Sequence, residues 1–410
     1  MVETVEEKNL ESRIKNQVGN AEIIDLSKIQ KTSYTRLATG FDEFDRVLGG
    51  PASPVGGQGG GIVVGSLILV SGDPGIGKST LLTQLALNLE NSLYVAGEES
   101  AAQIKLRVDR IKLNAPLSVL NEIDIDVITD KIAQFKPSLV IIDSIQTLET
   151  QDLESVAGSV GQVRECAHRL QRIAKNLHIP IFLVGHVTKE GNLAGPKTLE
   201  HVVDVVLSLE GDSTSMFRIL RSTKNRFGPT DEVGVFEMEN QGMIEVKNPS
   251  KLFLEEKINA PGSAVICIMT GIRPLLVEIQ ALVTKTNMPI PRRTGSGIDN
   301  NRLQLLVAVL QKRLGLPLYD QDIFVNVTGG LRVFEPAADL GICMAIISSF
   351  KDISIKDKTL MIGEIGLLGE LRVVRQLEKR VTEAKKLGFP NVISSENAKT
   401  LTIAVKLALY

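Results

Sequence analysis

Cysteine is scarce in this chain of 410 residues, and tryptophan is absent. The three cysteines, Cys166, Cys267 and Cys343, lie far apart, and the sequence contains no C-x-x-C pair. The sequence therefore favours neither a zinc site nor a disulfide framework. We interpret the three thiols as buried or inert.

Long apolar runs are also missing. No run approaches the roughly 18–20 residues that span a bilayer. The first residues, MVETVEEKNLESRIKNQ, are charged and lack the apolar centre of a signal peptide. We therefore expect a cytoplasmic protein. Hydrophobic residues make up 43% of the chain, enough to bury a substantial core, and the length is typical of two or three domains.

Charge of one sign does not dominate, because the formal net charge is only −2. The whole molecule therefore gives no electrostatic indication of nucleic-acid binding. The distribution is uneven: residues 251–410 carry 21 Lys and Arg against 15 Asp and Glu. The C-terminal part is thus a candidate for a basic face.

The first half of the chain predicts an α/β domain that follows a polar tail. Residues 1–30 are weakly patterned, and we expect a tail or linker there. After a loop rich in Gly and Pro at 51–60, short apolar strands alternate with helical segments. This pattern is typical of a parallel sheet covered by helices on both faces. The strands are expected at 65–72, 92–97, 139–142 and 181–185.

A break near 248–262, where NPS and APG interrupt the pattern, separates a second domain. Beyond the break, apolar strands such as SAVICIM and IFVNVTG mix with amphipathic helices, which predicts an α+β domain. The domain limits are therefore expected at 31–250 and 251–410. The helices of the second domain are expected at 302–314, 336–349 and 375–387.

A phosphate-binding loop is the most specific signal in the sequence. The pattern G-x-x-x-x-G-K-[ST] follows an apolar strand and opens a helix, which is the context that the motif requires. Glycines let backbone N–H groups cradle phosphates, and the helix N-terminus adds a positive dipole. We expect Lys78 to reach the β- and γ-phosphates of ATP and Ser79 to bind Mg²⁺. The predicted nucleotide-binding residues are Gly72, Asp73, Pro74, Gly75, Ile76, Gly77, Lys78, Ser79 and Thr80.

Polar side chains follow three of the expected strands, at the sheet edge where ligands of α/β proteins bind. Asp143 ends the strand LVII, and we expect it to hold Mg²⁺ through water. Glu98 and Glu99 follow the strand at 92–97, and either could polarise the attacking water. We favour Glu98, which comes first, although an acidic pair at a helix start is also favoured by the dipole alone. His186, followed by Thr188 and Lys189, is a candidate sensor of the γ-phosphate.

The order of these motifs resembles the bacterial RadA (Sms) family. The likeness extends over about residues 31–410 and is carried by GDPGIGKST, YVAGEES, LVIIDSIQTL, GHVTKEGNLAGPKTLEHVVD and KNRFG. The resemblance implies a RecA-like P-loop ATPase that acts in DNA repair and recombination. It further implies a hexameric ring related to replicative helicases, which binds single-stranded and branched DNA, works beside a recombinase and promotes branch migration.

In such a ring ATP lies between subunits, and the resemblance assigns Lys224 and Arg226 of KNRFG to the neighbour's phosphates or to DNA. Cations suit either role, because a transferring phosphoryl group carries spreading negative charge. The loops at 151–162 and 189–197 resemble DNA-facing loops, in which Lys189 and Lys197 would contact phosphates. Aromatic residues make up only 4% of the chain, so base stacking is expected to be secondary.

The C-terminal domain resembles the proteolytic domain of Lon, through VFEPAADLG and IGEIGLLGELRVVRQLEKR. Lon uses a Ser–Lys pair, but Ala337 stands at the serine position and Arg380 at the lysine position. Alanine has no nucleophile, and a permanently protonated arginine is a poor base, so the neighbouring Lys379 has nothing to activate. We expect a proteolytically inactive ring scaffold and DNA platform. Its candidate phosphate contacts are Arg292, Arg293 and Arg302.

Two departures from the family are visible. The four-cysteine zinc finger with which members usually begin is not present, and residues 51–60 look like an insertion.

The leading hypothesis is a DNA-dependent ATPase motor that uses ATP and Mg²⁺. The alternatives are an ATP-switched scaffold without motor action, which KNRFG disfavours, and an ATP-dependent peptidase, which Ala337 disfavours.

Overall fold

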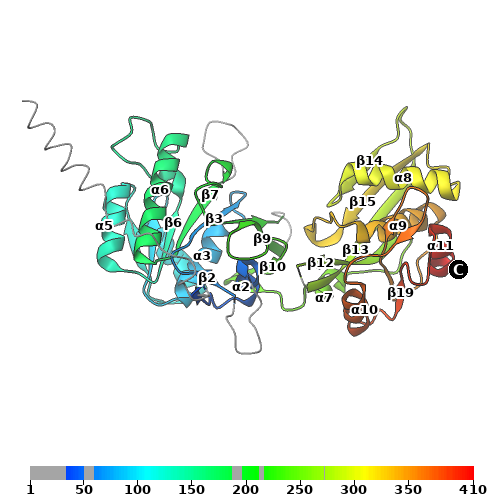
Figure 1. Ribbon diagram of the computed structural model, residues 1–410, viewed down its shortest axis with the longest axis horizontal. Coiled ribbons are helices and arrows are strands. Elements are labelled where there is room, and N and C mark those ends of the chain that lie inside the picture. Colours follow the sequence, from blue (N-terminus) through cyan, green and yellow to red (C-terminus); the bar gives the residue numbers. More distant parts are fainter. Residues whose placement is uncertain (1–33, 50–59, 187–195, 212–216, 272) are drawn as a thin grey trace, which may run out of the picture. The chain divides into compact units, whose positions relative to one another are not determined.

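The computed structural model (Figure 1) describes residues 34–49, 60–186, 196–211, 217–271 and 273–410. The expected tail at 1–30 and almost all of the expected insertion at 51–60 lie outside the described residues. The described part contains two large sheets, one of nine strands between Leu67 and Glu245 and one of six strands between Ser263 and Ile393.

The nine-stranded sheet has the order β11-β10-β9-β8-β3-β7-β6-β4-β5. Its six strands from β8 to β5 are parallel, and β9, β10 and β11 continue the sheet in antiparallel fashion from β8. The strands are β3 (Leu67–Gly72), β4 (Ser92–Ala96), β5 (Ser118–Asn121), β6 (Leu139–Asp143), β7 (Ile181–His186), β8 (Val205–Glu210), β9 (Phe217–Asn225), β10 (Val233–Glu239) and β11 (Gly242–Glu245).

Alternate side chains of the parallel strands enter different cores on the two faces of this sheet. In β3, Ile68 and Val70 pack in the core that includes α3 (Lys78–Asn88) and α4 (Ala101–Ile111). Leu67 and Leu69 pack in the core of α5 (Ile125–Phe135) and α6 (Val160–Leu177), which stand side by side in Figure 1. Burial on both faces explains why these strands are continuous apolar runs.

The helices of this domain begin where the sequence supplies caps. Ser100 and Gln103 form a capping box at the start of α4, and the Asp124 and Ser159 side chains cap α5 and α6. A smaller helix, α2 (Asp42–Gly49), packs against β9 and β10. Two short strands, β1 (Arg36–Leu37) and β2 (Ile62–Val63), pair antiparallel; β1 precedes α2 in the sequence and β2 follows it.

The six-stranded sheet has the order β14-β15-β13-β12-β16-β19 and mixes parallel with antiparallel pairs. Its strands are β12 (Ser263–Thr270), β13 (Arg273–Lys285), β14 (Arg293–Ser296), β15 (Gln321–Val327), β16 (Thr359–Met361) and β19 (Asn391–Ile393). The helices are α7 (Pro249–Glu255), α8 (Asn300–Leu314), α9 (Asp339–Lys351), α10 (Leu377–Lys386) and α11 (Leu401–Leu409), and β17 (Glu364–Ile365) pairs with β18 (Leu371–Arg372).

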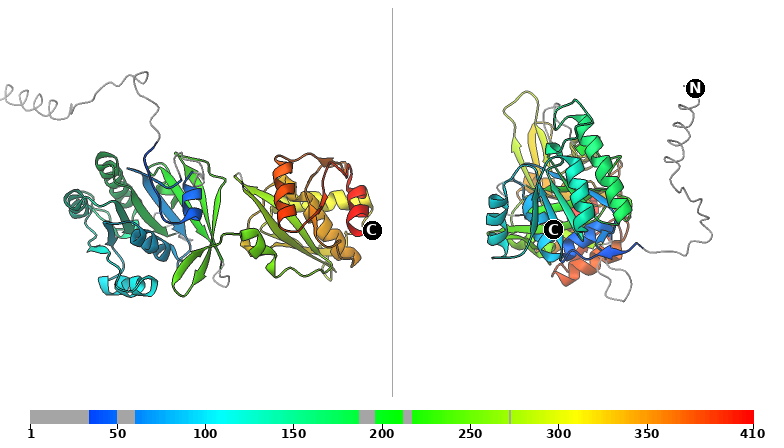
Figure 2. Two further views of the ribbon diagram at one scale, coloured as in Figure 1. Left: turned by 90° about the horizontal axis from the view of Figure 1, so that it is seen from below. Right: turned by 90° about the vertical axis from the view of Figure 1, so that its left-hand side faces the viewer.

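The two faces of this second sheet also carry separate cores. Helices α8, α9 and α11 share a core with Ile266 and Val277, whereas α10 packs on the opposite face against Val265, Cys267 and Leu276. Figure 2 shows these helices from two further directions. Helix α9 is buried along almost its whole length, which explains its nearly all-apolar sequence.

The predicted fold class, a parallel α/β domain followed by an α+β domain, is confirmed. The antiparallel extension β9–β11 was not expected from the pattern. The break near 248–262 contains the short helix α7, with Pro249 in its first turn and the Asn248 side chain as its cap. None of the described helices is both long and apolar enough to cross a membrane.

Candidate nucleotide site

The phosphate-binding loop joins β3 to α3 at the carboxyl edge of the parallel strands. Gly75 and Gly77 have φ angles of 77° and 112°, which L side chains rarely adopt, and this explains the glycines at these positions. Helix α3 begins at Lys78, and no side chain caps its N-terminus. The N–H groups of its first turn are therefore directed toward the space above the loop. From β9, Arg218 Nε donates a 3.0 Å hydrogen bond to the Ile76 carbonyl and supports the loop from behind.

Lys78 folds back over this loop. Its side chain is buried, and Nζ donates to the carbonyl oxygens of Gly72 at 2.9 Å and Asp73 at 3.0 Å. Burial lowers the pKa of Lys78, and the nearby Asp143, Asp73 and Glu98 carboxylates oppose that shift. The ammonium thus stands at the mouth of the loop with acceptors that an incoming phosphate can replace.

A cavity of about 280 Å³ opens above the loop. Its lining combines backbone donors, a hydroxyl, cations and carboxylates, which is the chemistry that a triphosphate with a divalent cation requires. The lining residues are Gly75, Gly77, Lys78, Ser79, Thr80, Glu98, Glu99, Arg107 and Asp143. Of the predicted loop residues, Asp73 and Pro74 are exposed at its rim, and Thr80 is buried.

Asp143 ends β6 beside the loop and is buried. The hydroxyl of Tyr94, a fully buried residue of β4, donates to Asp143 Oδ2. Burial, followed by the charge of Asp143, raises the pKa of Tyr94 well above its ordinary value, so the hydroxyl remains a donor at neutral pH. Ser79 and Asp143 line the same cavity, as a shared magnesium site requires. Among the described residues, no group of three or more His, Cys, Asp or Glu side chains is placed to hold a metal ion.

The two glutamates after β4 have different partners. Glu99 forms an ion pair with Arg107 of α4, and its side chain is 36% exposed. Glu98 Oε1 accepts a hydrogen bond from Ser144, the residue after Asp143. Glu98 is therefore tied to the end of β6, and Glu99 is turned to α4. This difference distinguishes the two glutamates that the sequence offers as candidates.

The predicted sensor and DNA-facing segments are only partly described. His186 ends β7, hydrogen-bonded in register beside Gly72, and its side chain lies outside the described residues. Thr188 and Lys189 also lie outside them. Lys197 is exposed in a 3-10 turn at Pro196–Thr198. The loop before α6 is held by the buried Gln162 side chain, which bonds the backbone of Thr150, Leu153 and Ser155.

Lys224 and Arg226 lie in the same sheet at the amino ends of the parallel strands, which is the edge opposite the phosphate-binding loop. Asn225 pairs with Val205 at the start of β8, and the Arg226 N–H donates to the Asp204 carbonyl. Because β8 runs parallel to β3, this edge holds the amino ends of the strands. The length of β3 alone, about 16 Å at 3.3 Å per residue, separates it from Gly72. Neither cation can reach the loop of its own chain.

Both cations rest on acceptors within the domain. Lys224 Nζ donates to the Glu200 carbonyl and, at 2.9 Å, to the Val203 carbonyl. Burial and the nearby Arg226 charge lower the pKa of Lys224. The Arg226 side chain is 51% exposed and lies 3.4 Å from the buried Asp204 carboxylate, which also accepts from Lys175 at 2.7 Å.

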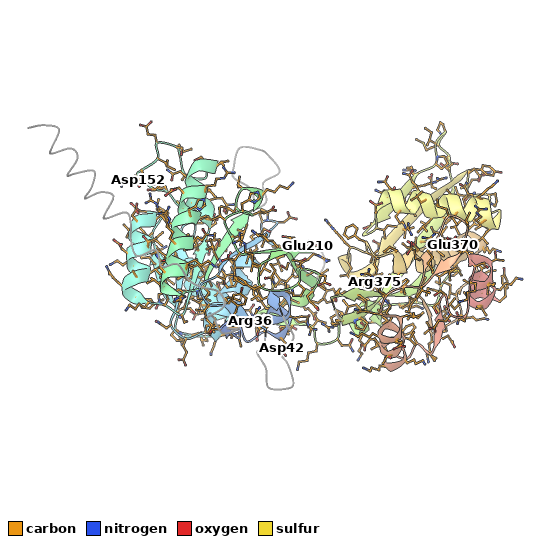
Figure 3. The ribbon with its side chains drawn as sticks, viewed as in Figure 1. Arg36, Asp42, Asp152, Glu210, Glu370 and Arg375 are labelled. Atoms are coloured by element: carbon orange, nitrogen blue, oxygen red, sulfur yellow. The ribbon has the colours of Figure 1, made fainter. Side chains whose placement is uncertain are left out.

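The other residues of KNRFG fix this turn. Asn225 Nδ2 donates to the Leu48 carbonyl at 3.0 Å, and its Oδ1 accepts from the Phe227 N–H at 2.9 Å. A Cβ on Gly228 would lie 2.6 Å from the Gly49 Cα, so only glycine fits. Arg36, labelled in Figure 3, donates to the Phe227 carbonyl at 2.8 Å. The motif thus presents the exposed Arg226 side chain on a turn that these hydrogen bonds fix in place.

The two Lon-like positions in the C-terminal domain, Ala337 and Arg380, are both buried. Ala337 is buried in the short 3-10 turn before α9. Arg380 is 1% exposed, ion-pairs with Glu335 and donates to the carbonyl oxygens of Cys267 and Arg375. All of these are acceptors for a permanent cation, so Arg380 has a structural role that a general base could not fill.

The three candidate arginines of this domain differ in exposure. Arg292 is 63% exposed and lies 3.5 Å from Asp322, and Arg293 is half-buried at the start of β14. Arg302 Nε donates to Asp339 Oδ1 at 2.9 Å, and Asp339 is buried. Arg302 therefore forms a structural ion pair with Asp339 within this domain.

Sequence reasoning missed Tyr94 and Arg107, although both lie in the motif YVAGEES and the helix that follows. A tyrosine inside an apolar strand is usually a core residue, and the sequence does not show that its hydroxyl meets Asp143, 49 residues away. The cysteines agree with expectation: all three are buried, and burial raises the pKa of Cys166 and Cys267 to about 12.

Comparisons with known proteins agree with this geometry. A family model described as "AAA domain" matches residues 35–192, and one described as "Subunit ChlI of Mg-chelatase" matches residues 298–398. The chain is 51% identical to the DNA repair protein RadA of Bacillus subtilis, over 90% of this chain and 80% of that protein. It is 45% identical to the DNA repair protein RadA of Streptococcus pneumoniae, over 97% of this chain and 93% of that protein.

Proposed function

The chain belongs to the family of the DNA repair protein RadA, and from this premise we propose that it is a DNA-dependent ATPase motor of recombinational repair. The motor would promote branch migration on single-stranded and branched DNA, beside a recombinase, as a hexameric ring. ATP hydrolysis is supported by the matched AAA domain together with the cavity above Lys78.

The proposed reaction uses residues that follow β3 and β4, together with Asp143 at the end of β6. The backbone of the loop and Lys78 bind the phosphates, and Ser79 with Asp143 would hold Mg²⁺, which supplies charge neutralisation at the transferring phosphoryl group. Glu98 would orient the attacking water. Orientation by a fixed carboxylate matters because this reaction depends on positioning and electrostatics.

The placement of KNRFG carries the motor proposal. Arg226 stands on a rigid turn at the sheet edge opposite its own phosphate-binding loop, so it can complete only a site on another subunit. In a head-to-tail ring, this edge of one subunit would face the loop of the next, and each hydrolysis event would act across an interface. We therefore propose that Arg226, supported by Lys224, stabilises the transition-state charge in trans.

The DNA-binding part of the proposal relies on basic side chains at exposed positions. Lys197 and Arg292 are the exposed described candidates, and Lys189 lies outside the described residues. Contacts of this kind would read phosphates and not base sequence, so binding should weaken steeply with salt.

The experiment is ATP turnover with and without single-stranded DNA on four preparations. These are the unaltered chain, Lys78→Ala, Arg226→Ala and an equal mixture of the two variants. We expect DNA to stimulate the unaltered chain and each variant alone to be inactive. In a randomly mixed ring about a quarter of the sites would pair an intact loop with a neighbour's intact arginine, so turnover should recover to about a quarter.

The control replaces Lys78→Ala in the mixture by the double variant Lys78→Ala/Arg226→Ala, which offers no arginine and should give no recovery. Absence of recovery in the first mixture, with subunit exchange verified, would place Arg226 outside the nucleotide site. Turnover that is indifferent to DNA would favour the ATP-switched scaffold instead.

A further inference from the structure

A row of four hydrogen-bonded side chains connects α4 to the metal-site strand. Arg107 of α4 ion-pairs with Glu99 through Nη2, and its Nη1 donates to the Tyr94 hydroxyl at 3.3 Å. Tyr94 in turn donates to Asp143 Oδ2. The Tyr94 part of the row is shielded from water, because Tyr94 is fully buried and the Arg107 side chain is 13% exposed, whereas Glu99 at its outer end is 36% exposed.

The local folds on both sides hold this row in place. Strand β4 lies beside β6, with Ala96 paired to Asp143 in register, so the long Tyr94 side chain reaches forward to the carboxylate. The capping box of Ser100 and Gln103 fixes the start of α4, from which Arg107 projects toward the cavity. Few alternative rotamers are available to a group with this many partners.

The consequence for Asp143 is directional. With Oδ2 committed to the Tyr94 hydroxyl, the second oxygen is the one available to water on a cation beside Ser79. A carboxylate that holds a metal is oriented by such outer hydrogen bonds, and their loss commonly costs 10–100-fold in metal affinity or activity. The same row keeps Glu99 on Arg107 and so separates the roles of the two adjacent glutamates.

We propose that Tyr94 and Arg107 are positioning residues of the magnesium site: Tyr94 orients Asp143, and Arg107 holds both Tyr94 and Glu99. This inference rests on the proposed ATPase function. It adds that the outer helix α4 sets the metal affinity of the site, through the contacts from Arg107 to Tyr94 and from Tyr94 to Asp143.

The first test is a magnesium titration of basal ATP turnover, without DNA, for Tyr94→Phe. This substitution keeps the buried ring and removes only the hydroxyl. We expect the Mg²⁺ concentration for half-maximal turnover to rise about tenfold and kcat to fall. Binding of a fluorescent ATP analogue in EDTA should stay within about twofold, because the phosphate cradle is unchanged.

Arg107→Gln should shift the titration in the same direction, and Arg107→Lys should recover part of the loss, since an ammonium keeps the charge but cannot bridge both partners. Lys105→Gln, at an exposed position on the other side of the same helix, is the matched control and should leave the titration unchanged. Thermal melts of each variant separate a loss of positioning from a loss of folding.

The glutamates supply an independent outcome. Glu98→Gln should abolish turnover and leave the magnesium dependence of analogue binding nearly unchanged, whereas Glu99→Gln should raise the magnesium demand of turnover. Unaltered half-saturation and kcat in Tyr94→Phe would overturn the proposal, as would loss of turnover in Glu99→Gln with Glu98→Gln active. If the unaltered chain shows no turnover, the proposed function fails, and magnesium-dependent binding of the analogue still tests the positioning role.

Discussion

The buried guanidinium of Arg380 offers a quantitative test of how the Lon-like positions are used. Replacing Arg380 by Met keeps an unbranched apolar stem and removes every donor of the head group. The carbonyl oxygens of Cys267 and Arg375 then lose a hydrogen bond, and the Glu335 carboxylate loses its counterion. Arg375 is labelled in Figure 3.

The magnitude follows from the burial of the pair. Removing one partner of a buried ion pair typically costs 3–5 kcal/mol, because the remaining charge is left uncompensated. Glu335 keeps a 2.9 Å hydrogen bond from the Met269 N–H, and its side chain is 27% exposed, so part of its charge stays solvated. We therefore expect about 3 kcal/mol, which for a domain of this size lowers the melting temperature by roughly 6–12 °C.

The assay is calorimetric unfolding of the full chain, in which an ATP analogue with Mg²⁺ raises only the transition of the domain that binds it. The unshifted transition then reports on the C-terminal domain. Lys379→Met, at the exposed neighbouring position, is the control and should change stability by less than about 0.5 kcal/mol. Melting of Arg380→Met within about 2 °C of this control would refute a structural role for the guanidinium.

Three further predictions follow from single contacts. A Cβ on Gly97 would lie 1.9 Å from Thr147 Oγ1, so Gly97→Ala should lose about 1–3 kcal/mol in denaturant unfolding, and Thr147→Ala in the same chain should restore part of it. Arg292→Gln should weaken single-stranded DNA binding and lower the salt slope by about 0.7, with little change in melting temperature, since the Arg292 side chain is 63% exposed. Because burial raises the pKa of Cys166 and Cys267 to about 12, the neutral thiol is favoured at pH 8, so thiol reagents should modify the cysteines only after unfolding.

Features that depend on residues close together in the sequence were predictable. The loop at 72–80 and Asp143 are local patterns: glycines between a strand and a helix, and a carboxylate at the end of an apolar strand. The parallel α/β arrangement follows from the same alternation. These signals suffice because the carboxyl ends of parallel strands meet at one edge wherever the strands stand in the sheet.

Contacts that depend on strand order could not be predicted from the sequence. Tyr94 and Asp143 are 49 residues apart, and Arg380 and Glu335 are 45 apart. Each pair looks unremarkable in its own segment, a tyrosine in an apolar strand and an arginine in an amphipathic helix. Only the register of β4 against β6, and the packing of α10 on its sheet, brings the partners together.

The direction of β9 has the largest consequence for the proposed mechanism. A parallel crossover after β8 would have returned KNRFG to the carboxyl edge, beside the chain's own loop. The antiparallel turn instead delivers it to the amino edge. Two copies joined amino edge to amino edge would leave each loop without a neighbour's arginine, whereas a head-to-tail arrangement joins unlike edges at every interface. We therefore expect hydrolysis to require the closed head-to-tail assembly, and a dimer held by identical edges to bind ATP without turning it over.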